Sequence, residues 1–292
     1  MNRLIRNISR LVVSALVLVS VSACGQRTAH SEETQTEAIQ TEPTSPEPDT
    51  LTAMSFNVYA GKQTEQRRMS VLQTILRYLP DTVGVQEATP EWMDYLKENL
   101  GELYGFVGTG REGGEKGEHC AILYRKERFE LVETDTKWLS DTPNEVSKYE
   151  ESSYIRIFTY AVLTDRETGS ELVVVNTHLD NGSSVAREKQ LAVLLNHLER
   201  FSETPLILTG DFNCRRGRGV YKTVTEVLTD SFEIALEKKD MATYMGSSMG
   251  VIDYVFVSSH ISEVLDYRVI AVPENGMIPS DHLPVLIEYS VR

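Results

Sequence analysis

Four short polar motifs stand out in this sequence because each follows an apolar run. They are Val85-Gln86-Glu87, Asn176-Thr177-His178, Gly210-Asp211-Phe212-Asn213 and Ser280-Asp281-His282. Their carboxylate and amide oxygens suit hard divalent cations such as Mg²⁺, which keep open coordination positions for phosphate oxygens. The histidines beside them can hold or transfer a proton near neutral pH. The pattern therefore predicts a catalytic metal site for phosphoryl chemistry, and hence an enzyme that cleaves phosphoesters.

The elements that must position these residues are predicted to alternate between strands and helices. Apolar residues at helical spacing predict helices over 72–79 and 191–198, and Thr89-Pro90 predicts the N-cap and first turn of another helix. Segments rich in β-branched and aromatic residues predict strands over 51–58, 82–86, 120–124, 154–163, 172–177, 206–209, 252–257, 267–272 and 284–289.

These strands are numerous enough to fill two sheets. A sheet that is covered by helices on one face must pack its other face against something, and a second sheet is the simplest partner. We therefore predict an α/β fold with four layers, an α/β/β/α sandwich of two mixed β-sheets flanked by helices. Residues 51–292 contain no second linker or detectable internal repeat, so we expect one domain.

The motifs occur in an order that resembles the endonuclease/exonuclease/phosphatase superfamily of DNase I-like proteins. This superfamily includes nucleases, bacterial sphingomyelinases, inositol polyphosphate 5-phosphatases and deadenylases. The segment 120–129, with Trp138-Leu139-Ser140, is similar to a branch of small, exported bacterial members. The resemblance implies a DNase I-like sandwich with Mg²⁺ or Mn²⁺ as cofactor. It rests on Ser55-Phe56-Asn57, Gln86-Glu87, Asn176-Thr177-His178, Gly210-Asp211-Phe212-Asn213, Ile252-Asp253-Tyr254 and Ser280-Asp281-His282.

The metal is expected on three of these residues. Glu87 is predicted to be the direct ligand, supported by Asn57 and, through water, by Asp281, because a cation with open positions needs few but rigid protein oxygens. Asp211 and Asn213 are two residues apart, so in an extended segment both side chains leave the same face and suit the activation and orientation of a water molecule. Taken alone, Asp-Phe-Asn more often forms a turn.

Two histidines are expected to act on the phosphoryl group. His282 lies next to Asp281 and has Asp253 as a candidate partner for its other ring nitrogen, which would raise its pKa. The resemblance implies that His282 either stabilises the phosphoryl oxygens or acts as the base, jointly with Asp211. It also implies that His178 binds the transferring group or assists the leaving oxygen.

Arginines offer further contacts to substrate. Arg156 lies inside a predicted apolar strand and is a candidate phosphate ligand, although an edge-strand arginine that faces water is the alternative. Arg215, Arg216 and Arg218 follow the Gly-Asp-Phe-Asn motif, and a solvated basic surface is the other interpretation of that run. The Gly-rich segment 110–118 is predicted to be a hairpin loop, with a lid over the site as the alternative.

The charge of the chain narrows the list of partners. Its formal net charge is −14, and most of this negative charge lies in residues 51–292. Nucleic-acid binding depends on neutralisation of phosphates by Lys and Arg, so nucleic acid is disfavoured as a partner, and only the local arginines keep a nuclease as an alternative. A small phosphate-ester substrate is expected instead, and the protein is expected to be a monomer.

The N-terminus has the pattern of an export signal. Arg3, Arg6 and Arg10 precede the apolar stretch 11–23, which is short for a membrane span and has the length of a signal-peptide core. It ends in Val21-Ser22-Ala23-Cys24-Gly25, which resembles the processing box of bacterial lipoproteins. We expect residues 1–23 to be a lipoprotein signal peptide. Ordinary secretion, with cleavage at a small-residue site, is the alternative.

The segment that follows is expected to be a tether. Residues 24–50 are poor in large apolar groups and rich in Thr, Glu, Pro and Ser, so they are predicted to be disordered. A lipidated Cys24 would anchor the exported domain to the cell membrane or envelope. We predict a metal-dependent phosphodiesterase that uses in-line attack of water on a small or lipid-linked phosphodiester. The alternatives are an extracellular nuclease and a non-catalytic binding lipoprotein, which would be expected to lack a motif acid or histidine.

Overall fold

The computed structural model describes residues 50–246, 250–271 and 279–291. The predicted signal peptide, Cys24 and the tether up to residue 49 lie outside the described residues. Thr50, the last residue of the predicted tether, is already the first residue of a strand. Within the described ranges, no helix has the length and apolar character needed to cross a membrane.

One sheet has seven strands and mixed pairing. β1 runs parallel to β2, whereas β13 is antiparallel to β1 and β4 is antiparallel to β2. In spatial order the strands are β10 (Glu237–Lys239), β12 (Ile261–Val269), β13 (Val285–Val291), β1 (Thr50–Asn57), β2 (Thr82–Ala88), β4 (His119–Arg125) and β3 (Tyr104–Val107).

The second sheet has six strands and is also mixed. β7 is parallel to β8, and β11 is antiparallel to β8. In spatial order the strands are β5 (Phe129–Trp138), β6 (Ile157–Asp165), β7 (Glu171–His178), β8 (Leu206–Asp211), β11 (Asp253–Val257) and β9 (Thr229–Asp230).

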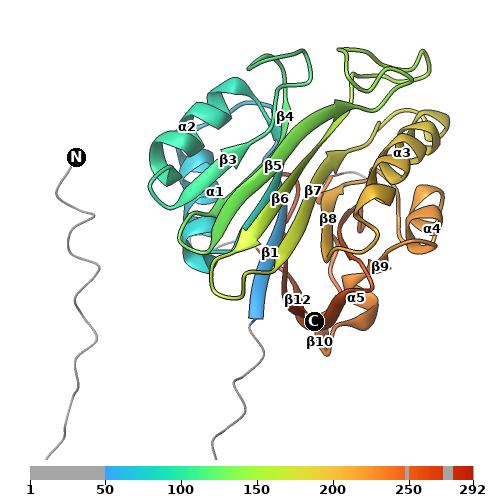
Figure 1. The fold of residues 1–292 in the computed structure, drawn as a ribbon. Helices are drawn as coiled ribbons and strands as arrows, with labels where there is room; N and C mark the ends of the chain where they lie inside the picture. Colours follow the sequence, from blue (N-terminus) through green and yellow to red (C-terminus); the bar gives the residue numbers. More distant parts are fainter. Residues whose placement is uncertain (1–49, 247–249, 272–278, 292) are drawn as a thin grey trace, which may run out of the picture. The chain divides into compact units, whose positions relative to one another are not determined.

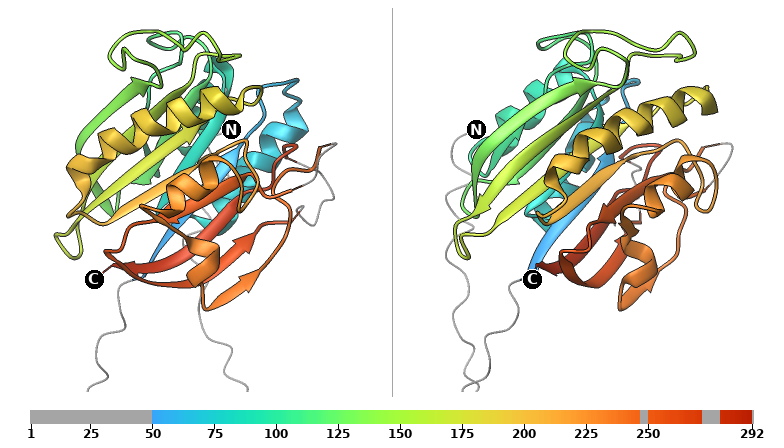
Figure 2. Two further views of the ribbon diagram at one scale, coloured as in Figure 1. Left: turned by 90° about the vertical axis from the view of Figure 1, so that its right-hand side faces the viewer. Right: turned by 45° about the vertical axis from the view of Figure 1, so that its right-hand side comes forward.

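Helices cover the outer face of each sheet (Figure 1). α1 (Glu65–Tyr78) and α2 (Pro90–Leu100) bury Ile75 and Trp92 against the seven-stranded sheet. α3 (Ser184–Leu198) and α4 (Val220–Thr225) lie on the six-stranded sheet, and Figure 2 shows α3 along its outer face. Two short elements complete the set, the 3₁₀ turn Glu199–Phe201 and α5 (Ser231–Ile234). The predicted four-layer α/β/β/α sandwich is confirmed.

The helix termini follow from local sequence. Thr89 caps α2 by accepting a hydrogen bond from the Trp92 N–H, and Pro90 occupies the first turn, as predicted. Thr64 and Ser183 cap α1 and α3 in the same way. These caps fix where each helix begins.

The inner faces of the two sheets form a shared apolar core, which includes Ala53, Val174, Ile207 and Ile287. The sheets come especially close at Gly84 in β2. A Cβ atom at this position would lie 2.0 Å from Thr209 Oγ1 and 2.7 Å from Asn176 Oδ1 in the opposite sheet. Glycine is therefore required there by the close approach of the two sheets.

Some strands were not predicted. β5 is ten residues long, but most of its side chains are at least partly exposed, so it has no apolar run. β3, β9 and β10 are two to four residues long. The strand predicted from Tyr154 begins only at Ile157, because Asp180 binds the backbone N–H groups of Ser153 and Tyr154 and holds them in a loop. The strand predicted over 267–272 is the end of the longer β12, and residue 272 is not described.

Candidate active site

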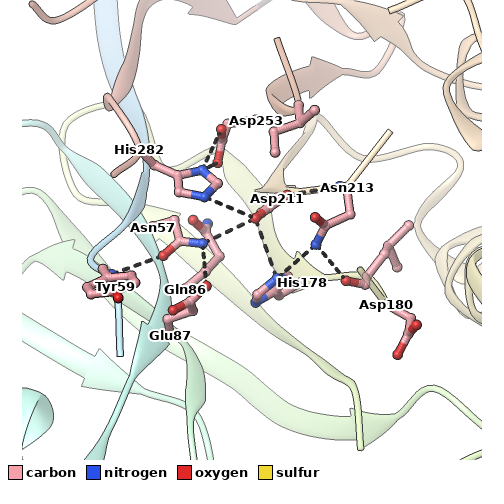
Figure 3. Close-up of polar contacts among 12 residues, drawn as sticks. Asn57, Tyr59, Gln86, Glu87, His178, Asp180, Asp211, Asn213, Asp253 and His282 are labelled. Atoms are coloured by element: carbon pink, nitrogen blue, oxygen red, sulfur yellow. Dashed lines mark hydrogen bonds and ion pairs between the residues drawn. The ribbon is translucent and has the colours of Figure 1, made fainter. Parts of the chain in front are cut away.

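Polar strand ends meet at one edge of the sandwich. In the six-stranded sheet, Asp211 at the end of β8 lies opposite His178 of β7 on one side and Asp253 of β11 on the other. Asn57 ends β1, and Glu87 is the last residue but one of β2. These strands lie far apart in the sequence, but Figure 3 shows their side chains converging on Asp211.

A cavity of about 510 Å³ opens at this edge. Every predicted site residue lines it except Asn57 and Asp253, which lie behind the lining and are each only 1% exposed. The volume is within the range of small-molecule sites, roughly 300–1,000 Å³. The site therefore consists of side chains that line the cavity and of Asn57 and Asp253 behind them.

Glu87 is aimed into the cavity by an irregular strand end. The pairing of β2 with β4 is interrupted by a bulge between Val85 and Ala88, and Glu87 has a φ of 58°. Such a left-handed conformation is unusual for a residue with a side chain and is characteristic of functional positions. Glu87 Oε1 accepts a hydrogen bond from Asn57 Nδ2 at 3.0 Å, and Oε2 accepts one from the Ala60 N–H at 2.8 Å.

Asn57 contributes its nitrogen to this arrangement. Its Nδ2 also donates to Asp211 Oδ2 at 3.1 Å, while its Oδ1 accepts the Tyr59 N–H at 3.0 Å. In this orientation Asn57 bridges two acids through its nitrogen, and its oxygen accepts a backbone hydrogen bond. Its role as a metal ligand stays a prediction.

His282 and Asp253 form a tight pair. His282 Nδ1 lies 2.9 and 3.0 Å from the two oxygens of Asp253, and its Nε2 lies 3.8 Å from Asp211 Oδ2. Burial alone would lower the pKa of His282, but the carboxylates of Asp253 and Asp211 outweigh burial and raise this pKa to about 10. The geometry confirms the predicted pairing and favours an imidazolium that points Nε2 toward the cavity.

Asp211 lies at the centre of the cluster, and its negative charge is the least favourable one there. Burial, and then the negative charge of Asp253, raise the pKa of Asp211 to about 7, while His282 opposes the shift. Three acids therefore face one protonated histidine. A divalent cation would relieve this repulsion, so the donor set fits the expected metal.

The ligand atoms are close enough to share an ion. One group comprises Glu87, His178 and Asp211, and another comprises Asp211, Asp253 and His282, with the ligand atoms of each group within 4.8 Å of one another. Asp281 belongs to neither group. It is partly buried, lines the same cavity and has a raised pKa, caused first by burial. Its role in binding metal also stays a prediction.

His178 and Asn213 form the opposite side of the cluster. His178 Nε2 lies 3.4 Å from Asp211 Oδ2 and 3.1 Å from Asn213 Nδ2. Burial and the nearby cation of Arg156 lower the pKa of His178 well below its ordinary value, so this ring is neutral where His282 is charged. The two histidines therefore differ in charge and can have different roles in the reaction.

The Asp211–Asn213 segment differs from the extended geometry used to predict it. Asn213 has a φ of 48°, and its N–H donates to Asp211 Oδ1 at 2.8 Å, so the chain turns directly after β8. The extended interpretation was wrong, and the turn was the correct alternative. Both side chains still reach the cavity because Asn213 Nδ2 is held by the Leu179 carbonyl at 3.0 Å.

Arg156 lies in the loop before β6 and is buried, so both predicted placements, within a strand and facing water, were wrong. It is 5% exposed and lines the cavity, and its Nε has no hydrogen-bond partner in the described part of the chain. A buried guanidinium with an unsatisfied donor is suited to an incoming anion. Of the arginines after Asn213, Arg215 lines the cavity, whereas Arg216 is paired with Asp230 and Asp240.

Sequence reasoning missed the buried residues that hold the site. Asn176 bridges the sheets: its Nδ2 donates to the carbonyls of Val85 and Ala121, and its Oδ1 accepts from Gln86 and Thr209. Its membership of the Asn-Thr-His motif was the available signal.

Asp180 was also missed. It is fully buried, and it accepts the N–H groups of Ser153 and Tyr154 in one loop and of Gly182 and Ser183 before α3. Asp180 thereby fixes the loop that leads to Arg156 beside the end of β7. Its place two residues after His178 was the only hint in the sequence.

Residues 54–282 match the Endonuclease/Exonuclease/phosphatase family. The chain belongs to this family. Its members are phosphoesterase and nuclease-type hydrolases that generally depend on a metal, and the predicted superfamily is confirmed.

Several known proteins are similar to the chain. A mannosyl-6-phosphatase from Bacteroides thetaiotaomicron is 29% identical, with a TM-score of 0.75 over 82% of this chain and 99% of that one. An endonuclease/exonuclease/phosphatase family protein from the same organism is also 29% identical, with a TM-score of 0.76 over 84% and 99%.

Curated relatives are more distant. The 3'-5'-exoribonuclease subunit Ccr4 of the CCR4-Not complex from Yarrowia lipolytica is 24% identical over 347 residues, which cover 84% of this chain but only 48% of the relative. The chain thus spans about half the length of this exoribonuclease subunit. The relatives named here include a phosphatase and an exoribonuclease, so their names do not agree on one substrate.

Proposed function

We propose that the protein is a Mg²⁺- or Mn²⁺-dependent phosphodiesterase that hydrolyses a small or lipid-linked phosphodiester by in-line attack of water. The observation that carries the proposal is the His282–Asp253 pair, which points Nε2 at Asp211 inside a cavity that Glu87 also lines. A binding protein without catalysis would not need this cluster of opposed charges at the cost of burying them.

The proposed metal site uses Glu87 as the direct ligand, supported by Asn57 and, through water, by Asp281. When bound, the cation would neutralise phosphoryl oxygens and lower the pKa of water. The residues of the chain do the rest: Asp211 accepts a proton from the attacking water, which Asn213 orients. His282, held protonated by Asp253, donates a hydrogen bond to the phosphoryl oxygens as their charge develops.

Arg156 and His178 complete the proposed phosphoryl site. Arg156 offers guanidinium donors to the non-bridging oxygens, and neutral His178 contacts the transferring group or the leaving oxygen. The position of both residues on the cavity wall next to Asp211 supports these roles. No covalent intermediate is needed, because water is the nucleophile.

A nuclease is the second candidate. It is favoured by the exoribonuclease relative and by Arg215 on the cavity wall. The net charge of −14 disfavours it, because a polyanion would be repelled outside the cavity. A short oligonucleotide therefore belongs in the substrate test.

The test is hydrolysis of bis-(p-nitrophenyl) phosphate and p-nitrophenyl phosphate by the full-length chain, with Mg²⁺, with Mn²⁺ or with EDTA. We expect metal-dependent cleavage that favours the diester and is lost in His282→Ala. His260→Ala is the matched control, because His260 follows the far end of β11 from Asp253 and should cleave like the wild type. Activity that persists in EDTA would overturn the metal-dependent mechanism.

We also propose that the protein belongs to the small, exported bacterial branch of the family and acts as a monomer anchored through lipidated Cys24. The signal-like segment 1–23 and the lipoprotein-like box around Cys24 support this proposal. Cys24→Ala should move the protein from the membrane fraction to the soluble exported fraction. Light scattering of detergent-solubilised protein should give a single-chain mass.

A further inference from the structure

One charged pair in the cavity wall has no role in the proposed hydrolysis. Arg111 Nη1 lies 2.7 Å from Glu118 Oε2, and both side chains are largely buried yet line the cavity. They come from the loop between β3 and β4, in the Gly-rich segment that was predicted to be a hairpin or a lid. The pair lies on the wall that contains His178, where both residues border a recess shared with Glu87 and Arg156.

The pair is held in place from several sides. The Arg111 N–H donates to the Glu118 carbonyl at 3.0 Å, and Trp138 Nε1 donates to the Arg111 carbonyl at 2.7 Å. The Arg111 guanidinium also lies 5.2 Å from the centre of the Tyr154 ring. These contacts form a fixed hairpin, so Arg111 and Glu118 present a preorganised donor and acceptor to the cavity.

The part of the substrate that this pair contacts follows from where the phosphoryl group binds, and this step rests on the proposed function. The phosphoryl group and the cation occupy the end that Glu87, Asp211 and His282 line. Arg111 and Glu118 border a recess beside that end, and Tyr154 lines the same cavity, so these side chains are placed to contact the group that is esterified to the phosphate.

The chemistry of these three side chains selects that group. A hydroxyl can donate to a carboxylate and accept from a guanidinium, so a pair of hydroxyls matches an Arg–Glu pair. Tyr154 is 47% exposed and offers a ring edge or face to C–H groups. A further phosphate of a polynucleotide would meet an ion pair whose opposite charges largely cancel, so the pair offers it no net attraction.

We propose that Arg111, Glu118 and Tyr154 form a subsite for an uncharged, polyhydroxylated group, the chemistry of a sugar or polyol linked to phosphate. The same group occurs free in solution and as the headgroup of a lipid. The substrate class is therefore a sugar or polyol phosphoester, in preference to an internal nucleotide of a chain.

The experiment compares four substrates of the full-length chain with Mg²⁺: bis-(p-nitrophenyl) phosphate, glycerophosphoglycerol, vesicles of phosphatidylglycerol, and a thymidine decanucleotide. Glu118→Gln keeps the size of the side chain and removes its charge. We expect it to lower kcat/KM for the glycerol diesters about ten-fold more than for bis-(p-nitrophenyl) phosphate, because it weakens a charge-assisted hydrogen bond to a hydroxyl. The ratio between the free and the vesicle substrate tells which source is preferred.

Two further variants keep the test decisive. Tyr154→Ala removes a half-exposed ring and should shift the same ratio in the same direction even if Glu118→Gln fails to fold. Glu130→Gln disrupts an equivalent but exposed pair, in which Arg166 Nη1 lies 3.1 Å from Glu130 Oε2, and should change neither rate.

The outcomes separate the two proposals. Absence of metal-dependent cleavage of bis-(p-nitrophenyl) phosphate by the wild type would overturn the proposed function. Cleavage of that ester with no cleavage of either glycerol diester would overturn only the subsite. Equal losses on all substrates in Glu118→Gln and Tyr154→Ala, or a wild-type preference for the decanucleotide, would do the same.

Discussion

Two buried polar clusters lie one or two residues apart on the same strands, and they are built in opposite ways. The neutral amide cluster consists of Gln86, Asn176, Thr209 and Ser55, and its members hydrogen-bond chiefly to one another and to backbone carbonyls across the sheets. The charged cluster around Asp211 contains the acids Glu87, Asp211 and Asp253, and the one protonated histidine among them, His282, is hydrogen-bonded to Asp253 and lies 3.8 Å from Asp211.

The two clusters have different roles, because the neutral one stabilises the fold and the charged one is placed for the reaction. Neutral groups that hydrogen-bond to one another, with Gln86 Oε1 left without a partner among the described residues, stabilise the contact between the sheets without an excess of charge. Charges that are held together without full compensation destabilise the fold and remain available to a cation and a phosphate. Substitutions in the charged cluster should therefore affect activity, and substitutions in the neutral amide cluster should affect stability.

The largest effect is expected from Asp211→Asn. This change keeps the shape but removes the proton acceptor, so kcat for bis-(p-nitrophenyl) phosphate should fall roughly 10³-fold. Because folding raises the pKa of Asp211, its ionised form is destabilising, and the melting temperature at pH 8 should stay the same or rise. A large fall in melting temperature would show that Asp211 is mainly structural and would contradict the proposed difference between the two clusters.

Asn176→Ala tests the neutral cluster. It leaves the carbonyls of Val85 and Ala121 without their buried donor, so the free energy of unfolding should fall by about 3 kcal/mol. Urea denaturation measures the change. Asn99→Ala is the matched control: within the described part of the chain its exposed amide bonds only the Tyr95 carbonyl, and its loss should cost less than about 0.5 kcal/mol.

Metal binding at the charged cluster should stabilise the folded protein. Mg²⁺ at about 100 times its Kd should raise the free energy of unfolding by roughly 2–3 kcal/mol. Thermal unfolding with Mg²⁺ or EDTA should detect this increase in the wild type and in Asn99→Ala, but not in Glu87→Gln. If Glu87→Gln retains the full increase, the cation does not bind at Glu87.

A smaller effect concerns pH. The folded pKa of His282 lies near 10, above its ordinary value of 6.5, so the stability that protonation supplies is complete below about pH 6.5 and is lost as pH rises toward 10. Asp253→Asn removes the main partner and should move the alkaline fall in kcat/KM down by at least one pH unit. An unchanged pH profile would mean that another group controls this limb.

The strand ends were predictable from sequence, whereas the loops were not. Glu87, His178 and Asp211 each follow an apolar run, and such strands must end at a common edge once they join two packed sheets. Arg156 was misplaced because the isoleucines on both sides of it look like a strand, although Asp180, 24 residues later, holds that segment as a loop.

Other parts of the site depend on packing alone. Arg111 and Glu118 come from a loop whose Gly-rich sequence has no apolar pattern, and contacts with distant residues such as Trp138 and Tyr154 hold it at the cavity. β5 alternates between exposed and more buried residues over 129–134, but few of its residues are fully buried and it has no apolar run. Sequence patterns report burial well, and they report the position of an exposed segment poorly.

Gly84 sets the separation of the two halves of the molecule. Its hydrogen atom stands where a methyl group would collide with Thr209 and Asn176, so the two sheets lie close together at this position. The contact at Gly84 therefore helps to set the distance between the two sheets near the active site. A single added methyl would spread Glu87 away from Asp211, and the affinity for the cation would fall although no ligand had been replaced.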